Sequence, residues 1–142
     1  NDKCDIIAEY SNLKNISLSK SEATPLIDEF PVLSIAAACG KGKMTMKGLG
    51  ELRYKESDRF KSISEGLKQS GVEVNTFKDN MEIIGTKKVR GGNIIVAQND
   101  HRIAMSFNIL NLFSEKPINV IGNKTIMTSF PSFFKTLYSL RA

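Results

Sequence analysis

The order in which strand-like and helix-like segments follow one another most constrains the fold of this chain of 142 residues. Alternating apolar residues predict a strand at residues 13–18, and an unbroken apolar run predicts a helix at residues 32–39. A strand, a helix and two strands follow. The same order then begins again about 72 residues further on, with Asp100 in the place of Asp28. A repeated alternation of strands and helices predicts an α/β fold.

In the first repeat, the segment VLSIAAAC (32–39) is apolar on all sides, so its helix is predicted to be buried. Pro31 suits a first helical position, where its missing N–H is not needed, and residues 25–31 are expected to form a loop. A second helix is predicted from about Glu56 until Gly71. Its inward positions are Phe60, Ile63 and Leu67. Short strands are predicted at residues 43–49, 72–77 and 80–85, the last two joined by a hairpin.

The second repeat is predicted to contain strands at residues 93–97 and 118–122. Asp100 is a plausible N-cap for a helix that runs to about residue 113, and residues 129–131 open a last helix. The residues expected to face inward are Met105, Ile109 and Leu112 in the first of these helices and Phe134, Leu137 and Tyr138 in the second.

These patterns divide the chain into three parts. Residues 1–12 are interpreted as the tail of a preceding unit, residues 13–90 as the first β-α-β-α-β-β unit, and residues 91–142 as a second unit without its final strand pair. The start of the chain is polar, lacks Met and does not resemble a signal peptide. We therefore expect the chain to begin inside a longer protein.

Composition narrows the class of protein. Hydrophobic residues make up 41% of the chain and the net charge is +5, which fits a packed protein that attracts an acidic small molecule or nucleic acid. The densest basic group, Lys87, Lys88 and Arg90, is interpreted as a solvated turn rather than a nucleic-acid patch. Cys4 and Cys39 do not make a disulfide framework, so a cytoplasmic location is expected. No apolar run approaches the roughly 20 residues of a membrane span, and no membrane partner is expected.

Polar and charged residues gather at the starts of the predicted helices. These residues are Asp28, Glu56 to Arg59, Asp100 to Arg102, and Thr128-Ser129, and Lys55 adds a third cation. A helix N-terminus attracts anions, and Arg59 and Arg102 can each grip a phosphate or carboxylate in two places. If the repeats stack in register, these helix starts point the same way and form one anion site.

The acidic residues in these clusters indicate that the site has a second function besides anion binding. A site that only binds anions has no use for Asp28 and Glu56, whereas a site that also moves protons does. Lys55, next in sequence to Glu56, is expected to hold that carboxylate charged or to share its proton. The structural alternative is that Glu56 and Asp58 are ordinary partners of a helix dipole and Asp100 only a cap. With one His and poorly placed Cys, no metal site is expected.

Three segments, LIDEFPVLSIAAA, ELRYKESDRF and NDHRIAMSF, occur in this order and at this spacing. Together they resemble the C-terminal lobe of the 5-enolpyruvylshikimate-3-phosphate (EPSP) synthase family, whose patterns are IDE-x-P, LR-x-KE-[ST]-DR and DHR-x-AM. The resemblance covers essentially the whole chain. It implies an inside-out barrel of β-α-β-α-β-β units, with buried helices and outer sheets, of which this chain holds about two in six.

The resemblance also implies an activity: transfer of the enolpyruvyl group of phosphoenolpyruvate to the 5-hydroxyl of shikimate 3-phosphate, with release of phosphate. The family uses no metal or organic cofactor, and its site lies in the cleft between two lobes. The implied partners are the two anionic substrates and the N-terminal lobe of the same protein. The full-length protein is expected to be a monomer, and this chain alone is expected to be inactive.

The resemblance also implies roles for single residues, according to their positions in the motifs. Asp28 resembles the acid that contacts the shikimate hydroxyls and accepts a proton, and Lys55 resembles the lysine near the reacting hydroxyl. Glu56 resembles the carboxylate that moves a proton at the methylene carbon. Arg59 and Arg102 resemble the two arginines that hold phosphoenolpyruvate.

Three further residues are expected to support the site. Asp100 and His101 complete the second motif. Thr128 stands where some members carry a lysine that meets phosphoenolpyruvate, so that contact differs here.

Two alternatives are kept. The related UDP-N-acetylglucosamine enolpyruvyl transferase shares the fold and the donor, but the segments KESDR and DHRIAM argue against it. A basic module that binds nucleic acid would fit the net charge and would bind less tightly as salt increases. It would leave the acids Asp28, Glu56 and Asp58 without an explanation.

Overall fold

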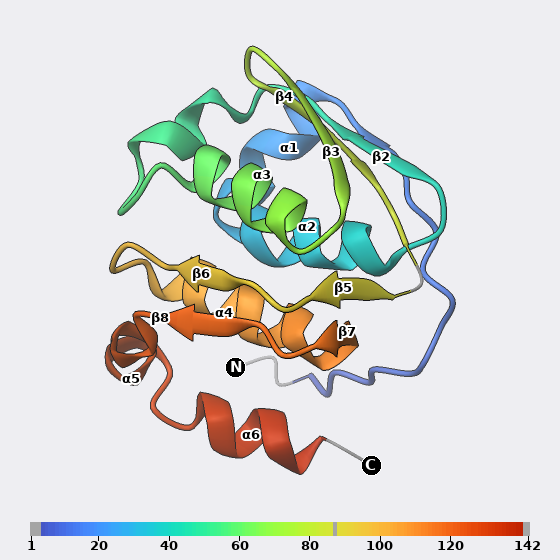
Figure 1. Cartoon of the computed structure of the whole chain (residues 1–142). Helices are drawn as coiled ribbons and strands as arrows, with labels where there is room; N and C mark the ends of the chain where they lie inside the picture. Colours follow the sequence, from blue (N-terminus) through green and yellow to red (C-terminus); the bar gives the residue numbers. More distant parts are fainter. Residues whose placement is uncertain (1–3, 87, 141–142) are drawn as a thin grey trace.

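The protein, analysed as a computed structural model that describes residues 4–86 and 88–140, is a mixed α/β chain (Figure 1). Most of the predicted strand and helix order of the first repeat is present. Its elements are β1 (Ser17–Leu18), α2 (Phe30–Cys39), β2 (Lys43–Met46), α3 (Arg59–Gln69), β3 (Glu73–Phe77) and β4 (Asn80–Ile84). The helix expected from the run VLSIAAAC is α2, with Pro31 in its first turn.

The first four strands form one sheet in the order β1-β2-β4-β3. β1 runs parallel to β2, and the other neighbours are antiparallel. The predicted hairpin joins β3 and β4, and its turn holds Lys78 at a positive φ of 50°. The predicted strand at residues 13–18 is shorter than expected, because apart from Ser17–Leu18 it contributes only a single bridge between Lys14 and Lys41.

The later strands form two separate parallel pairs. β5 (Val89–Gly91) pairs with β7 (Ser114–Lys116), and β6 (Ile94–Val96) pairs with β8 (Asn119–Ile121). Neither β5 nor β7 was predicted, and β5 lies across the unit boundary expected at residue 90. Arg90, interpreted as part of a solvated turn, is thus a strand residue, and Lys87 lies outside the described residues.

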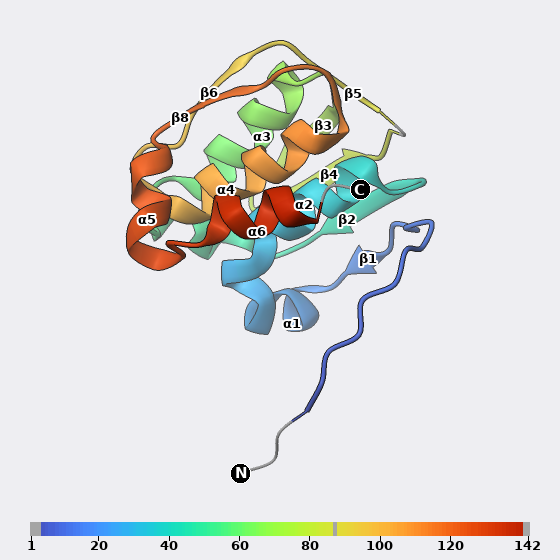
Figure 2. The same ribbon diagram turned by 90° about the horizontal axis from the view of Figure 1, so that it is seen from below.

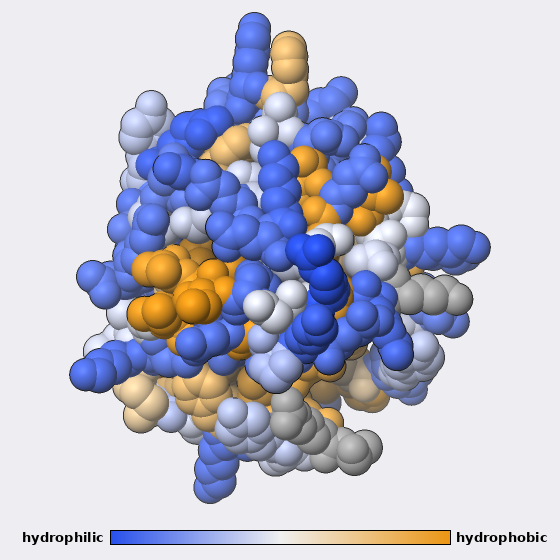
Figure 3. All heavy atoms as spheres, in the orientation of Figure 1, coloured by the Kyte–Doolittle hydropathy of each residue, from blue (hydrophilic) through white to orange (hydrophobic). Residues whose placement is uncertain are grey.

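An apolar patch lies over β6 and β8 in the space-filling view (Figure 3). The side chains of Ile94, Val96 and Ile121 are exposed there, whereas Ile95 between them is buried. This alternation means that each strand of the pair turns one face to the core and the other to solvent.

Three helices, α2, α3 and α4 (His101–Leu110), pack against one another. Figures 1 and 2 show them between the four-stranded sheet and the strand pairs. Gly66 of α3 permits the close approach of α4, because a Cβ at this position would lie 2.3 Å from the ring of Phe107. The packing brings the first turns of α3 and α4 together, and both turns carry candidate site residues.

Residues 25–31 are not the predicted loop. α1 (Lys20–Ala23), capped by Ser19, is followed by the 3-10 helix η1 (Thr24–Glu29), which leads directly into α2. A second 3-10 helix, η2 (Leu49–Tyr54), precedes α3, so α3 begins at Arg59 rather than near Glu56. Short 3-10 turns have little apolar periodicity of their own, which explains why the sequence pattern missed them.

The apolar residues of α4 are buried to different depths. Ile103, Phe107 and Leu110 are fully buried. Met105 and Ile109, which were predicted to face inward, are partly buried and pack against the hydrophobic core, and Leu112 lies beyond the end of the helix, also partly buried. The helix carries two apolar stripes, and the more deeply buried one was not predicted.

The C-terminal part comprises η3 (Asn111–Phe113), η4 (Asn123–Thr125), α5 (Ile126–Ser129) and α6 (Phe133–Ser139). The predicted last helix corresponds to α6, which begins at Phe133, shortly after the opening expected at residues 129–131, and the short helix α5 before it was not predicted. Phe133 is its buried aromatic residue, while Tyr138, expected to face inward, is exposed. Among the described residues, no helix has the length and apolar character needed to cross a membrane.

Candidate active site

The predicted clusters at the starts of α2, α3 and α4 lie together in the structure. Asp28 lies in η1, two residues before α2, and Lys55 and Glu56 lie between η2 and α3. Asp100 caps α4, as predicted, by accepting hydrogen bonds from the amides of Arg102 and Ile103. The turn before it holds Gln98 and Asn99 at positive φ, and the Asp100 amide closes this turn onto the carbonyl of Ala97.

Arg59 joins all three segments through its guanidinium group. Its Nε donates to Asp100 Oδ2 at 2.7 Å, its Nη1 to Asp28 Oδ1 at 3.0 Å, and its Nη2 to Glu56 Oε2. Only 1% of its side chain is exposed. Burial alone would lower the pKa of Arg59, but Asp100, Glu56 and Asp28 outweigh this effect and raise it. The group is a permanently charged hub at the meeting point of the helices.

Asp100 is fully buried, and its contacts go well beyond those of a helix cap. Besides the two amides of α4, it accepts hydrogen bonds from Arg59 and, at 3.1 Å, from Ser57 Oγ. The carboxylate thereby connects the start of α3 with the start of α4. A buried charge with this many donors is compensated, so its burial does not carry the usual penalty.

Lys55 does not pair with Glu56, which was our expectation from their adjacency. Its Nζ lies 2.7 Å from Glu51 and 3.3 Å from Asp28, while Glu56 pairs with Arg59. The hydrogen bond to Glu51 is the main cause that raises the pKa of Lys55, and Asp28 adds to it. Lys55 therefore remains an ammonium group at neutral pH.

Asp28 shares one carboxylate oxygen, Oδ1, between Arg59 and Lys55. Burial acts to raise its pKa, but the hydrogen bond to Lys55 and the charges of Lys55, Arg59 and Arg102 together lower it. The carboxylate is thus ionised at neutral pH and available as a hydrogen-bond acceptor.

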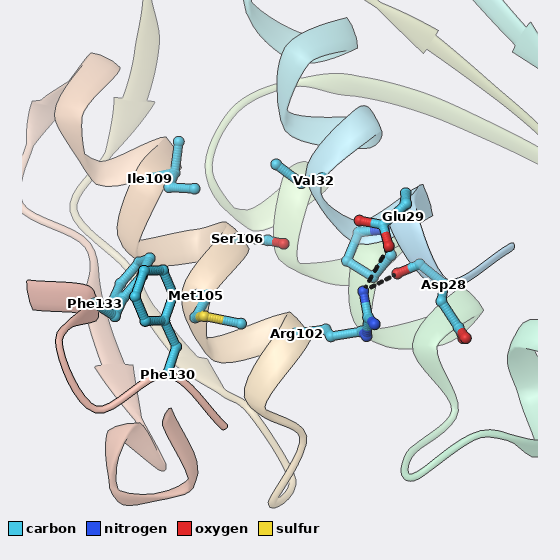
Figure 4. A pocket seen from close by; sticks show the side chains of 10 residues that line it. Asp28, Glu29, Val32, Arg102, Met105, Ser106, Ile109, Phe130 and Phe133 are labelled. Atoms are coloured by element: carbon cyan, nitrogen blue, oxygen red, sulfur yellow. Dashed lines mark hydrogen bonds and ion pairs between the residues drawn. The ribbon is translucent and has the colours of Figure 1, made fainter. Parts of the chain in front are cut away.

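Arg102 extends from the first turn of α4 toward the end of η1, as Figure 4 shows. Its Nη1 donates to the carbonyl of Asp28 at 2.9 Å and to Glu29 Oε1 at 3.0 Å. One side of the guanidinium borders a cavity of about 200 Å³. The apolar part of this cavity is lined by Pro31, Val32, Met105, Ile109, Phe130 and Phe133. The half-buried stripe of α4 forms one wall of this cavity.

Charges in the cluster do not favour an anion in the way the sequence indicated. Three cations are in contact with five carboxylates, so acids exceed bases by two. The acids are Asp28, Glu29, Glu51, Glu56 and Asp100. An anionic ligand must therefore displace one of these carboxylates or meet further cations at the same place.

Two of the predicted residues are not joined to this cluster by the contacts above. His101 begins α4 beside it, partly exposed. Thr128 lies within α5, not at the start of the last helix, and its Oγ1 donates to the carbonyl of Thr125. Within the part of the chain that the structure describes, no group of His, Cys, Asp and Glu side chains could hold a metal ion.

Two residues of the cluster, Glu29 and Glu51, were not among the predicted site residues. Both stand inside the quoted segments, so their position was a usable signal. Ser57 lies inside the predicted run from Glu56 to Arg59, but its contact with Asp100 was not predicted. Glu51 lies four residues before Lys55, a spacing that commonly pairs charges on a helix.

Comparisons with known proteins show the family to which the chain belongs. The family model described as EPSP synthase (3-phosphoshikimate 1-carboxyvinyltransferase) matches residues 1–137. The chain belongs to the EPSP synthase family. Among curated members, the 3-phosphoshikimate 1-carboxyvinyltransferase of Chelativorans sp. is 40% identical over 143 residues, and that of Petrotoga mobilis is 41% identical over 139 residues.

The match covers most of this chain and a smaller part of each relative. The two alignments cover 99% and 97% of the chain and 32% of each relative. An EPSP synthase structure from Acinetobacter baumannii superposes with a TM-score of 0.84 at 39% identity, covering 90% of this chain and 30% of that one. The chain thus spans about a third of the length of these EPSP synthase family members.

Proposed function

We propose that this chain supplies part of the active site of a 3-phosphoshikimate 1-carboxyvinyltransferase. The reaction would transfer the enolpyruvyl group of phosphoenolpyruvate to the 5-hydroxyl of shikimate 3-phosphate and release phosphate. The observation that carries this proposal is the convergence of the three family motifs on one guanidinium group, that of Arg59. The relatives from Chelativorans sp. and Petrotoga mobilis are both named for this activity.

We assign anion binding first to Arg102 and Lys55. Their side chains are 33% and 20% exposed, against 1% for Arg59, so a ligand from solution can reach them. Arg59 would contact phosphoenolpyruvate only after Glu56 or Asp28 moves away from it. Until then its role is to hold both carboxylates in place.

Proton transfer is assigned to Asp28, Glu56 and Lys55. A carboxylate whose pKa is lowered is a weak base, so Asp28 in the empty site is poorly suited to take a proton from the hydroxyl of shikimate 3-phosphate. Bound phosphate groups would neutralise the neighbouring cations and return basicity to Asp28. Glu56, released from Arg59 by the same ligand, would then exchange a proton with the methylene carbon.

The remaining parts of the proposal concern the whole protein. The helices would lie inside an inside-out barrel of β-α-β-α-β-β units, two of which fall at residues 13–90 and 91–142. The other lobe would supply the cations that this cluster lacks. We further propose a monomeric cytoplasmic enzyme without cofactor, membrane or nucleic-acid partner. Asp100 and His101 would support the site, and the role of the family lysine at Thr128 would pass to another residue.

The test uses a protein of the relatives' full length that contains this chain. Changing Lys55 or Glu56 to Ala should lower turnover, followed as phosphate release, by about 100-fold or more, since each would remove a proton-transfer group. Lys61→Ala is the matched control, because Lys61 is an exposed lysine of α3 with only a distant ion-pair partner. Near-normal turnover in both site variants would contradict the assignment. The 142-residue chain alone should show little or no turnover.

A further inference from the structure

Glu29 is a carboxylate of the cluster for which the proposed reaction has no use. It is the last residue of η1, and its side chain remains 55% exposed although it pairs with Arg102. Arg102 is in turn the most exposed of the three cations in the cluster. The ion pair between them therefore stands where a ligand from solution would first meet a positive charge.

The two acceptors of Arg102 differ in kind. The carbonyl of Asp28 is fixed by the backbone and carries no net charge, whereas the Glu29 carboxylate is an anion at the end of a flexible side chain. Figure 4 shows both dashed contacts converging on the end of the Arg102 side chain. If Glu29 moves away, the contact to the carbonyl still holds Arg102 in the same direction. The guanidinium then presents its unused donors to another anion.

We propose that Glu29 is an internal counter-anion that a phosphate or carboxylate group must displace from Arg102, and that it thereby sets the affinity of the site for anions. The inference rests on the proposed function, since it concerns the same anion site. An exposed ion pair is weak, so its displacement should weaken binding only about two- to fivefold. Glu56 and Asp28 differ from Glu29 in this respect, because they contact an arginine that is almost completely buried.

The experiment measures anion binding by the 142-residue chain. The wild type and Glu29→Gln are titrated with phosphoenolpyruvate and with inorganic phosphate, by calorimetry or by amide chemical shifts. Glu29→Gln should bind both anions about two- to fivefold more tightly, because Gln leaves Arg102 without a competing charge. Circular dichroism and thermal unfolding check that the variant is folded. Glu29→Asp, whose stem is shorter by one methylene, should show a smaller gain.

Two controls separate this effect from a change in overall charge. Glu82→Gln removes the same charge from an exposed glutamate that pairs with Lys43 at 3.0 Å on the four-stranded sheet, and it should leave anion binding unchanged. In an Arg102→Ala background, the change Glu29→Gln should have no effect, because the pair that it breaks no longer exists.

The outcomes are distinct. Measurable binding that is equal or weaker in Glu29→Gln would overturn the inference and leave the proposed function standing. A gain that Glu82→Gln reproduces, or that persists without Arg102, would overturn it as well. Absence of binding in every variant, at concentrations up to millimolar, would overturn both the inference and the assignment of an anion site to this chain.

Discussion

The two arginines of the cluster occupy matching places in sequence but opposite surroundings in the structure. Arg59 and Arg102 each lie in the first turn of a helix, one and two residues after the aspartate that caps it. Arg59 is buried among three carboxylates, whereas Arg102 is partly exposed and has one carboxylate and one carbonyl. A sequence motif therefore places an arginine at a site, but the residues around that arginine determine whether it stabilises the fold or is accessible to a ligand.

The largest expected difference between them is in stability. Arg59→Ala leaves Asp100 buried without its cation and should lower the free energy of unfolding by about 3–5 kcal/mol. Arg102→Ala breaks an exposed pair and should lower it by less than about 1 kcal/mol. Urea denaturation of the two variants measures both values. Similar losses would mean that the two arginines do not differ as their burial indicates.

The second test compares two aspartates that both cap helices. Asp100 caps α4 and is buried against Arg59, and Asp58 caps α3 in an exposed position. Asp58→Ala should cost about 1 kcal/mol, the usual value for a lost cap. Asp100→Ala should lower the free energy of unfolding by about 3 kcal/mol or more, because it also leaves the buried Arg59 guanidinium without one of its carboxylate partners. Equal values from urea denaturation would assign Asp100 a capping role only.

The smallest expected effect is on how the free energy of unfolding changes with pH at acidic pH. The pKa of Asp28 is lowered in the folded protein, so its contribution is complete above the unfolded value of about 3.9 and is lost as the pH falls through the folded value. Asp28→Asn should therefore lose stability less steeply than the wild type below about pH 4. Unfolding curves recorded at successive pH values test this. The same pH dependence of the free energy of unfolding in the variant and the wild type would contradict it.

Much of the fold could be predicted because local patterns were strong. The apolar run of α2, the hairpin turn before Asn80 and the capping role of Asp100 all depend on residues close in sequence. β5 and β7 could not be predicted in this way. Each has three residues, and their pairing joins segments that are distant in the chain. The sequence Ser114–Lys116 is polar and carries no strand signal.

The sequence predicted most of the residues that form the site, but not which of them pair with one another. The helix starts converge on Arg59 as the motif positions indicated, yet adjacency wrongly paired Lys55 with Glu56. The unpredicted stripe of α4 has a related cause, because a helix with two apolar stripes does not reveal which one is buried more deeply. The depth of burial depends on packing between segments that are distant in the chain, and the spacing of residues within one helix does not determine it.

The buried carboxylate of Asp100 has a consequence for how the protein opens. It holds the amides of Arg102 and Ile103 together with the side chains of Ser57 and Arg59. Separating the first turns of α3 and α4 would leave charge unpaired in the interior, so these turns unfold together or not at all. Those two amides should then exchange with deuterium only in large cooperative openings, whereas the nearby side chain of Glu29 is held only by its exposed ion pair with Arg102.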